Sequence, residues 1–191
     1  MSNDDNVKYI VFKGVYPPAE DTFLLLDYLS KLNVNGIRVL EVGCGCGVIS
    51  IFLAKKGALV TAVDINDKAI KNTKYNAQIN GVKIDVYKSN LLANVKGKYD
   101  LIIFNTPYME VREDPQYSGG TDLILKFLTQ SIKSLNSHGR VVFTAYDKND
   151  IGLIITQGLI LGLNIKIVMR RRLFFEEIYV LSGYRMPKYQ S

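Results

Sequence analysis

Short apolar runs alternate along the chain with amphipathic stretches. Compact apolar runs bounded by glycine, asparagine or charged residues predict strands, here at residues 38–42, 59–64, 84–88, 99–104, 139–145, 165–170 and 178–184. Apolar positions three and four residues apart predict helices at 19–32, 48–55, 68–80, 122–135 and 149–161. A further short strand is expected at 7–12, before a rigid turn at 14–18.

The regular alternation of strand and helix predicts an α/β fold with a doubly wound, mostly parallel sheet. The last two predicted strands leave no room for a helix between them, so they should form an antiparallel hairpin at the sheet edge. The 191 residues suffice for one domain over 1–191, in which 1–36 forms an N-terminal extension.

Composition is that of an ordinary globular protein, with 48% hydrophobic and 22% charged residues. No apolar run approaches the roughly 20 residues that cross a bilayer. The polar, acidic start of the chain does not resemble a signal peptide, so a cytoplasmic protein is expected. The net charge of +6 is compatible with nucleic acid or an RNA-associated partner, but many soluble proteins are as basic.

No metal site is expected. The two cysteines, Cys44 and Cys46, are too close in sequence for an unstrained disulfide, and His138 is the sole histidine. Both cysteines are interpreted as small residues that fill a loop.

That loop is the most informative stretch. The predicted strand at 38–42 runs into Glu41-Val42-Gly43-Cys44-Gly45-Cys46-Gly47, and a helix begins at Val48. The spacing is not the G-x-G-x-x-G of dinucleotide sites, and no Gly-Lys-Ser/Thr follows as in phosphate loops. Glycines let a ligand approach the main chain, which suits a nucleotide-like ligand at a helix N-terminus. The alternative is a tight turn whose glycines serve packing alone.

Asp64 ends the next predicted strand, seventeen residues after Gly47. A carboxylate there can accept hydrogen bonds from both ribose hydroxyls of a nucleoside. The alternative role is a helix cap, which either Asp64 or Asn66 could provide.

The glycine loop resembles the first motif of the Rossmann-like S-adenosylmethionine (AdoMet) methyltransferases. The resemblance implies AdoMet as cofactor and the seven-stranded sheet of class I methyltransferases. It also implies a Glu41 near the methionine end of the cofactor and an Asn90 and Leu91 near the adenine. Glu41 could instead cap the loop amides, and Asn90 could be a plain turn residue.

The strand at 99–104 runs into Asn105-Thr106-Pro107-Tyr108, which resembles the (Asn/Asp/Ser)-Pro-Pro-(Tyr/Phe) motif of methyltransferases that act on planar nitrogens. The side-chain oxygen of Asn105 and the carbonyl of Thr106 could accept from the two N–H bonds of such a nitrogen. Tyr108 could lie against its plane. The alternative is a turn that merely ends a strand.

Thr106 departs from that motif, which has proline at its position. Threonine adds an N–H and frees one dihedral angle, so the loop is expected to be less preorganised, and a proline at 106 should keep or raise activity.

Residues 15–26, Val-Tyr-Pro-Pro-Ala-Glu-Asp-Thr-Phe-Leu-Leu-Leu, narrow the resemblance to the short archaeal and eukaryotic members of the release-factor glutamine methyltransferase (HemK-like) family. The family pattern implies that Thr22 lies at the AdoMet site, with 1–36 covering it, and that Ser118-Gly119-Gly120 lies on the substrate side. The implied substrate is the glutamine amide of the Gly-Gly-Gln loop of a translation release factor. The implied partner is a small zinc-binding activator near the third strand, for which Val82, Ile84 and Val86 are candidate exposed contacts.

Two other functions remain open from the residues. One is methylation of an exocyclic base nitrogen in RNA or DNA, which needs the same geometry. The other is a non-catalytic AdoMet-binding subunit. The run Arg170-Arg171-Arg172-Leu173-Phe174-Phe175 could bind an acidic or RNA-bearing surface, or be a solvated hairpin whose apolar residues are buried.

Overall fold

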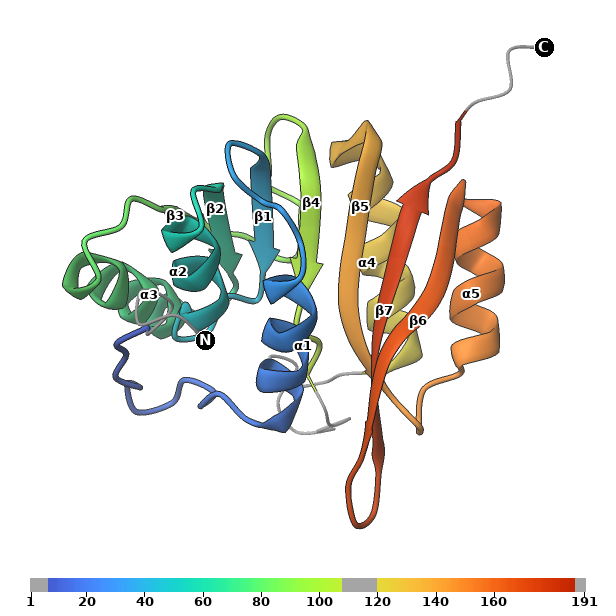
Figure 1. Ribbon diagram of the computed structural model, residues 1–191, viewed down its shortest axis with the longest axis horizontal. Helices are drawn as coiled ribbons and strands as arrows, with labels where there is room; N and C mark the ends of the chain where they lie inside the picture. Colours follow the sequence, from blue (N-terminus) through green and yellow to red (C-terminus); the bar gives the residue numbers. More distant parts are fainter. Residues whose placement is uncertain (1–6, 108–119, 188–191) are drawn as a thin grey trace.

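The computed structural model describes residues 7–107 and 120–187. They form a seven-stranded sheet flanked by helices, with strand order β3-β2-β1-β4-β5-β7-β6 (Figure 1). In chain order the elements are α1 (Glu20–Ser30), β1 (Arg38–Val42), α2 (Val48–Lys55), β2 (Leu59–Asp64), α3 (Asp67–Ile79), β3 (Asp85–Lys88), β4 (Tyr99–Phe104), α4 (Thr121–Ser134), β5 (Leu135–Tyr146), α5 (Ile151–Ile160), β6 (Leu163–Arg172) and β7 (Glu177–Arg185).

The predicted topology is confirmed. Strands β3, β2, β1, β4 and β5 pair in parallel, whereas β7 pairs antiparallel with both β5 and β6. The largest difference in bounds is β5, which begins at Leu135 rather than 139 because Leu135 already pairs with Tyr99 before a register irregularity. An isolated apolar pattern does not reveal such early pairing.

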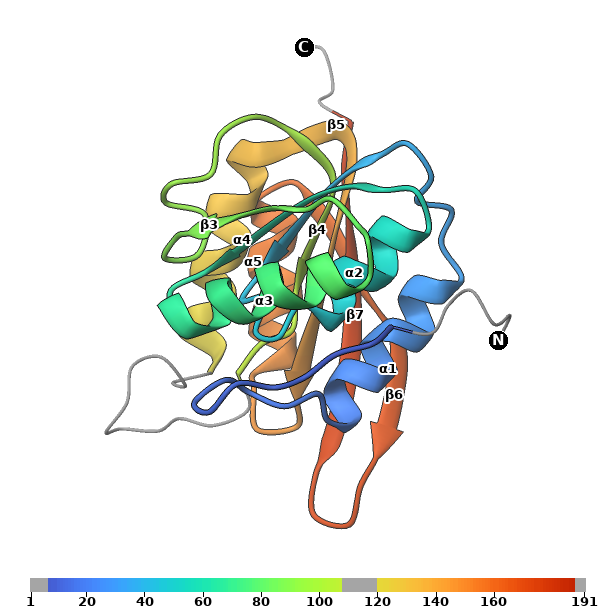
Figure 2. The same cartoon turned by 90° about the vertical axis from the view of Figure 1, so that its left-hand side faces the viewer.

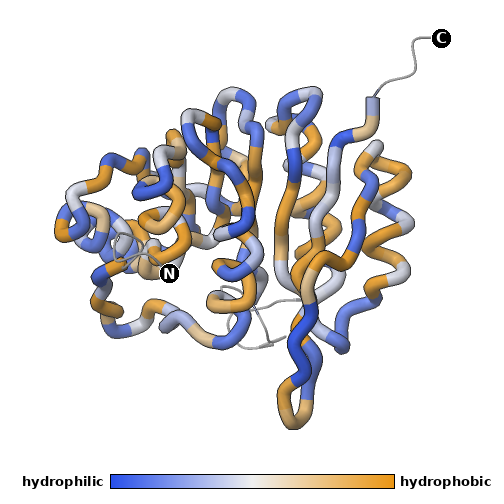
Figure 3. Tube along the Cα trace, in the orientation of Figure 1, coloured by the Kyte–Doolittle hydropathy of each residue, from blue (hydrophilic) through white to orange (hydrophobic). Residues whose placement is uncertain are grey.

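Helices cover both faces of the sheet (Figure 2), and most of the core forms two apolar layers, one on each face. Successive residues of a strand point to opposite faces. Leu101 and Ile103 of β4 accordingly join the layer under α1 and α2, while Ile102 and Phe104 join the layer under α4 and α5. The central strands are therefore apolar along much of their length (Figure 3).

The expected strand at 7–12 is not a strand. The segment is extended, but its backbone hydrogen-bonds to asparagine side chains of α3 and its C-cap over 2.6–3.1 Å. Asn80 bonds both backbone groups of Lys8, and Asn76 bonds both backbone groups of Ile10. Asn72 accepts from the Phe12 N–H and donates to the Ile10 carbonyl. Four helical residues rise about 6 Å, and two extended residues rise about 6.6 Å, so the two repeats match. This asparagine ladder fixes the segment that leads into the turn at 14–18.

The proposed activator contacts are not an exposed patch. Val86 is buried, and Ile84 packs against it in a small cluster with Cys44 and Ala62. Val82 is half-buried. Strand β3 does lie at one edge of the sheet, so one side of its backbone has no strand partner among residues 7–107 and 120–187. Within the described ranges no helix is both long and apolar enough to span a membrane.

Candidate active site

A cavity of about 480 Å³ opens where the carboxyl ends of β1, β2 and β4 meet. Such ends are where open parallel sheets bind ligands, and the volume suits a nucleoside-sized molecule. Residues from six separate segments line the cavity, among them Thr22, Glu41, Gly45, Asp64, Leu91 and Asn105. These six sequence-predicted residues are thus brought together at one site.

The glycine loop has backbone angles that explain its composition. Gly43, Gly45 and Gly47 have φ of 67°, 54° and 83°, in the left-handed region that disfavours side chains. Gly47 is also sterically required, because a Cβ there would lie 2.7 Å from a methyl of Thr73. Gly47 is the N-cap residue of α2 and does not line the cavity, whereas Gly43 and Gly45 do.

Asp64 anchors this loop and keeps capacity for a ligand. Its two carboxylate oxygens accept from the Gly45 N–H over 3.0 Å and from the Asn66 N–H over 2.8 Å. A carboxylate offers about four acceptor positions, so about two remain for hydroxyl groups. The α3 cap is provided by Asn66, whose side chain accepts from the Lys68 N–H. The capping alternative therefore belongs to Asn66. Burial raises the pKa of Asp64 above its usual value, against the effect of these bonds.

Glu41 lines the cavity from the carboxyl-terminal part of β1. Its side chain is buried, and the Ser50 hydroxyl donates to its carboxylate. Burial raises the pKa of Glu41 to about 8, while hydrogen bonds from Ser50 oppose the shift. A buried carboxylate with one direct side-chain partner suits the ammonium of an amino-acid group, which would favour its ionised form.

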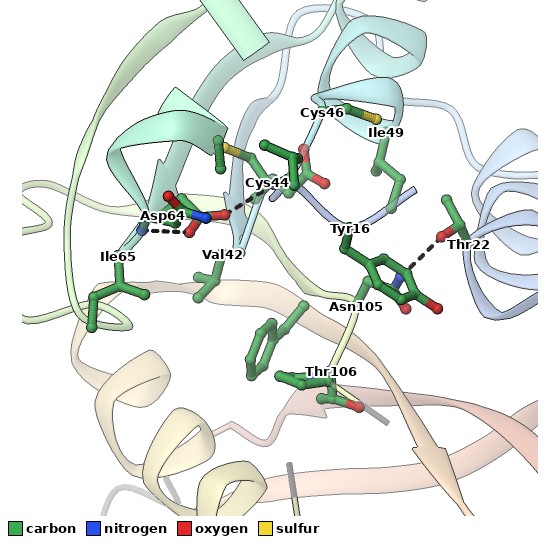
Figure 4. A pocket seen from close by; sticks show the side chains of 18 of the residues that line it. Tyr16, Thr22, Val42, Cys44, Cys46, Ile49, Asp64, Ile65, Asn105 and Thr106 are labelled. Atoms are coloured by element: carbon green, nitrogen blue, oxygen red, sulfur yellow. Dashed lines mark hydrogen bonds between the residues drawn. The ribbon is translucent and has the colours of Figure 1, made fainter. Parts of the chain in front are cut away.

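Asn105 is oriented by hydrogen bonds with three side chains, of which Figure 4 marks the bond to Thr22. Its amide nitrogen donates to Asp21 over 3.0 Å and to Thr22 over 3.1 Å. Its carbonyl oxygen accepts from the Thr144 hydroxyl over 3.0 Å. A carboxylate only accepts, so Asp21 determines which side of the amide faces it. Both N–H donors are thus engaged, and what Asn105 retains toward the cavity is an acceptor position on its oxygen.

The expected looseness at Thr106 is wrong. Thr106 is buried; its N–H donates to the Thr144 hydroxyl and its own hydroxyl donates to the Thr144 carbonyl, both over 2.8 Å. These bonds to β5 hold the loop where the motif otherwise has a proline ring. The Thr106 carbonyl accepts a long bond, 3.5 Å, from the Tyr146 hydroxyl.

Asp21 links these groups, although no sequence pattern predicts a role for it. It is buried in the first turn of α1, where it accepts from the Thr22 N–H, Asn105, and the hydroxyls of Tyr146 and Tyr16 over 2.7–3.4 Å. Burial and the Asp21 charge raise the pKa of Tyr16 to about 12 and also raise that of Tyr146. Both phenols therefore remain donors at neutral pH.

Comparison with known proteins decides the family. The sequence profile of the methyltransferase small domain matches residues 19–159. The chain belongs to the methyltransferase small domain family. A relative from Methanocaldococcus jannaschii named as a protein N5-glutamine methyltransferase is 36% identical, covering 95% of this chain and 98% of that protein. This methyltransferase is therefore a member of the HemK-like group, as its N-terminal stretch predicts.

Two further comparisons agree. Mouse methyltransferase HEMK2 is 44% identical over 108 residues, covering 51% of this chain and 50% of that protein. The structure of the E. cuniculi Mtq2-Trm112 complex, described as responsible for methylation of the eRF1 translation termination factor, superimposes with a TM-score of 0.73. It covers 90% of this chain and 98% of that one at 22% identity, which shows a shared fold.

The remaining predicted residues of this methyltransferase are placed as follows. Asn90 and Leu91 line the cavity beside Asp64, and Leu91, with φ of 47°, is the one non-glycine residue of the described ranges with positive φ. Pro107 also lines it. Tyr108, Ser118 and Gly119 lie outside the described residues, so their predicted roles stay predictions.

Five residues of the site were missed by sequence reasoning: Tyr16, Asp21, Asn76, Thr144 and Tyr146. An acidic residue in the first turn of a helix is explained by its favourable interaction with the helix dipole. The sequence therefore did not indicate that Asp21 is buried. The sequence does carry a signal for Asn76. Asparagine is a weak helix former, yet it recurs every four residues on this helix, at 72, 76 and 80.

Proposed function

We propose that this protein is an AdoMet-dependent methyltransferase of the glutamine amide in the Gly-Gly-Gln loop of a translation release factor. The observation that carries the proposal is the state of Asn105, whose N–H donors are engaged by Asp21 and Thr22. What it offers to a substrate is an acceptor, which an amide N–H needs. The naming of the Methanocaldococcus jannaschii relative as a glutamine methyltransferase and the methylation of eRF1 by the Mtq2-Trm112 complex support the same substrate.

The cavity fits AdoMet by the chemistry of its walls. Asp64 retains acceptor positions for ribose hydroxyls, and the buried Glu41 suits the ammonium of the methionine part. Gly43 and Gly45 allow close backbone approach, and Ile65 and Leu91 add apolar surface for a base. When bound, AdoMet supplies an electrophilic methyl group, so neither a metal nor a covalent enzyme intermediate is required.

The chain's own residues orient the nucleophile. The Asn105 oxygen and the Thr106 carbonyl accept from the two amide N–H bonds, and these bonds strengthen as positive charge develops on nitrogen. Asp21, Thr22 and Thr144 hold the Asn105 amide in one orientation before substrate arrives. The predicted role of Tyr108, lying against the amide plane, is part of this proposal.

The proposal includes a small zinc-binding activator docked on the β3 edge. Because Val86 is buried, the available contact is the unpaired side of the β3 backbone, extended by partly exposed side chains around it. Residues 1–36 are proposed to cover the cofactor, since Val15, Tyr16 and Pro18 line the cavity.

The test is single-turnover methylation of a release factor that contains Gly-Gly-Gln, with and without the activator. A Gln→Ala release factor should remain unlabelled. Asn105→Ala should lower the rate by roughly two to three powers of ten while AdoMet binding changes little. Labelling of the Gln→Ala factor, or nuclease-sensitive label in cell extract, would instead assign another residue or a nucleic acid as substrate.

A further inference from the structure

The tip of the β6–β7 hairpin exposes two phenylalanines. Leu173 to Glu176 form its turn, closed by a bond of 2.8 Å from the Leu173 N–H to the Glu176 carbonyl. Phe174 is 100% and Phe175 95% exposed, more than any other large apolar side chain of the described ranges. The expectation that a solvated hairpin buries its apolar residues is therefore wrong at these two positions. Adjacent aromatic rings left in water favour contact with a partner.

The hairpin points toward the side of the molecule that carries the active site. Because β7 is antiparallel to both β5 and β6, β6 runs in the same direction as β1, β2 and β4. Its carboxyl end at Arg172 therefore lies at the same end of the strands as Asp64 and Asn105, which line the cavity. Strand β5 ends at Tyr146, paired with Ile178, so the turn extends beyond that edge, as Figures 1 and 2 show.

The base of the hairpin is tied to the helix that builds the site. Arg171 forms an ion pair with Glu20 over 2.6 Å, and Glu20 directly precedes Asp21 in α1. Leu173 packs against the apolar layer under α1. The projecting tip therefore keeps a defined position relative to the cavity.

Charge surrounds the apolar tip. Arg170 and Arg172 alternate with Arg171, so they project to the opposite face of β6, and both are exposed. Neither forms an ion pair within the described part of the chain. Figure 3 shows the apolar tip following a strongly hydrophilic stretch. Glu176 and Glu177 follow the phenylalanines but are only partly exposed, and Glu177 accepts a hydrogen bond from the Tyr179 hydroxyl. The surface of the tip is therefore two apolar rings, which favour an apolar depression on a protein partner.

We infer that the β6–β7 tip is a docking element for the protein substrate, an inference that rests on the proposed function. Phe174 and Phe175 insert into an apolar depression on the release factor, and Arg170 and Arg172 pair with acidic side chains that border it. Docking at the tip holds the substrate while its glutamine loop enters the cavity. The tip thus contributes to recognition of the folded substrate, and the cavity alone recognises the amide.

The test compares two double variants. Phe174→Ala with Phe175→Ala removes the tip, whereas Leu159→Ala with Ile160→Ala removes another exposed adjacent pair, 57% and 71% exposed, at the end of α5. Helix α5 connects the carboxyl end of β5 to the amino end of β6. Its last residues therefore lie at the amino ends of these strands, remote from the cavity. Each variant is assayed with the whole release factor and with a short Gly-Gly-Gln peptide that cannot reach the tip.

The tip variant should raise KM for the release factor at least tenfold, with kcat, peptide methylation and AdoMet affinity within twofold of wild type. The control should change none of these. An unchanged KM for the release factor would overturn the inference, and so would an equal loss with the peptide, which would indicate damage to the site itself. If the wild type methylates neither substrate, the proposed function fails instead. A matching rise in KM with Arg170→Ala and Arg172→Ala, weakened by added salt, would support the acidic border.

Discussion

The Asp21 carboxylate accepts a hydrogen bond of 3.0 Å from the side-chain amide of Asn105, 84 residues away in sequence. This contact joins the first turn of α1 to the loop after β4. It leaves Asn105 with its oxygen as the group available to a ligand. The orientation of the predicted catalytic amide therefore depends on a residue outside its own motif.

Asp21→Asn should lower the methyl-transfer rate about 10- to 100-fold. Asp21 accepts hydrogen bonds from Asn105, Tyr146 and the Thr22 N–H, and an asparagine would turn an NH₂ donor toward some of these donors. Hydrogen bonds to a charged acceptor, worth about 1.5–3 kcal/mol, would then be lost. Single-turnover assays measure the rate, and calorimetry measures AdoMet affinity. If Asp21 acts through Asn105, the double variant with Asn105→Ala should be no slower than Asn105→Ala alone. Additive losses would contradict that role.

Asp64→Ala should weaken AdoMet binding by about 1–3 kcal/mol, because hydroxyl groups lose an ionised acceptor and the Gly45 N–H loses its partner. Asp64→Asn keeps one acceptor oxygen, so its loss should be smaller. Calorimetry on folded variants checks both values. An unchanged affinity in Asp64→Ala would rule out the ribose role.

Glu41 should make the free enzyme less stable as pH rises. Its pKa is raised from 4.5 to about 8 in the folded protein, so between those values the folded state holds a proton that the unfolded state has released. The contribution of Glu41 to the free energy of unfolding should be greatest below about pH 4.5. It should fall toward pH 8, with a slope of up to about 1.4 kcal/mol per pH unit. Urea unfolding from pH 5 to 8 checks this against Glu41→Gln, in which that part of the slope should vanish. Equal slopes would show that Glu41 ionises normally.

Thr106→Pro should lower both stability and activity, contrary to the expectation from the motif alone. Proline cannot donate to Thr144, and it also lacks the hydroxyl that binds the Thr144 carbonyl. The loss of stability should be about 1–3 kcal/mol, the cost of leaving buried partners unpaired. Thr106→Val keeps the N–H and should lose less. A proline variant as stable and active as wild type would show that the ring replaces both bonds.

Asn76→Ala should loosen the N-terminal cover of the cavity. Asn76 bonds both backbone groups of Ile10 and also donates to the Cys46 carbonyl in the glycine loop, over 2.8–3.1 Å. AdoMet affinity should fall several-fold, and residues 7–12 should become accessible to protease. Asn80→Ala is the matched control, because its ladder bonds reach Lys8 and not the glycine loop. Equal effects of the two variants would show that the link to Cys46 is unimportant.

Local patterns in the sequence sufficed for most of the fold. Strand and helix periodicity predicted all seven strands of the sheet, because an apolar run must be buried whichever strand it pairs with. The positive φ of Gly43, Gly45 and Gly47 likewise follows from residue type and spacing. The segment at 7–12 was mispredicted as a strand, since its partners are asparagine side chains that no local pattern identifies as such.

The sequence by itself determined which groups could do the chemistry. Asp64 ends β2, and Asn105 and Thr106 follow β4, so these groups must meet at the carboxyl ends of a parallel sheet. Only the tertiary structure decided how they are held. Asp21 and Thr144 reach Asn105 from elements 84 and 39 residues away, and hydrogen bonds across such separations depend on packing rather than on local sequence. The exposure of Phe174 and Phe175 was likewise decided by how far β6 and β7 extend beyond β5, which the pairing register sets.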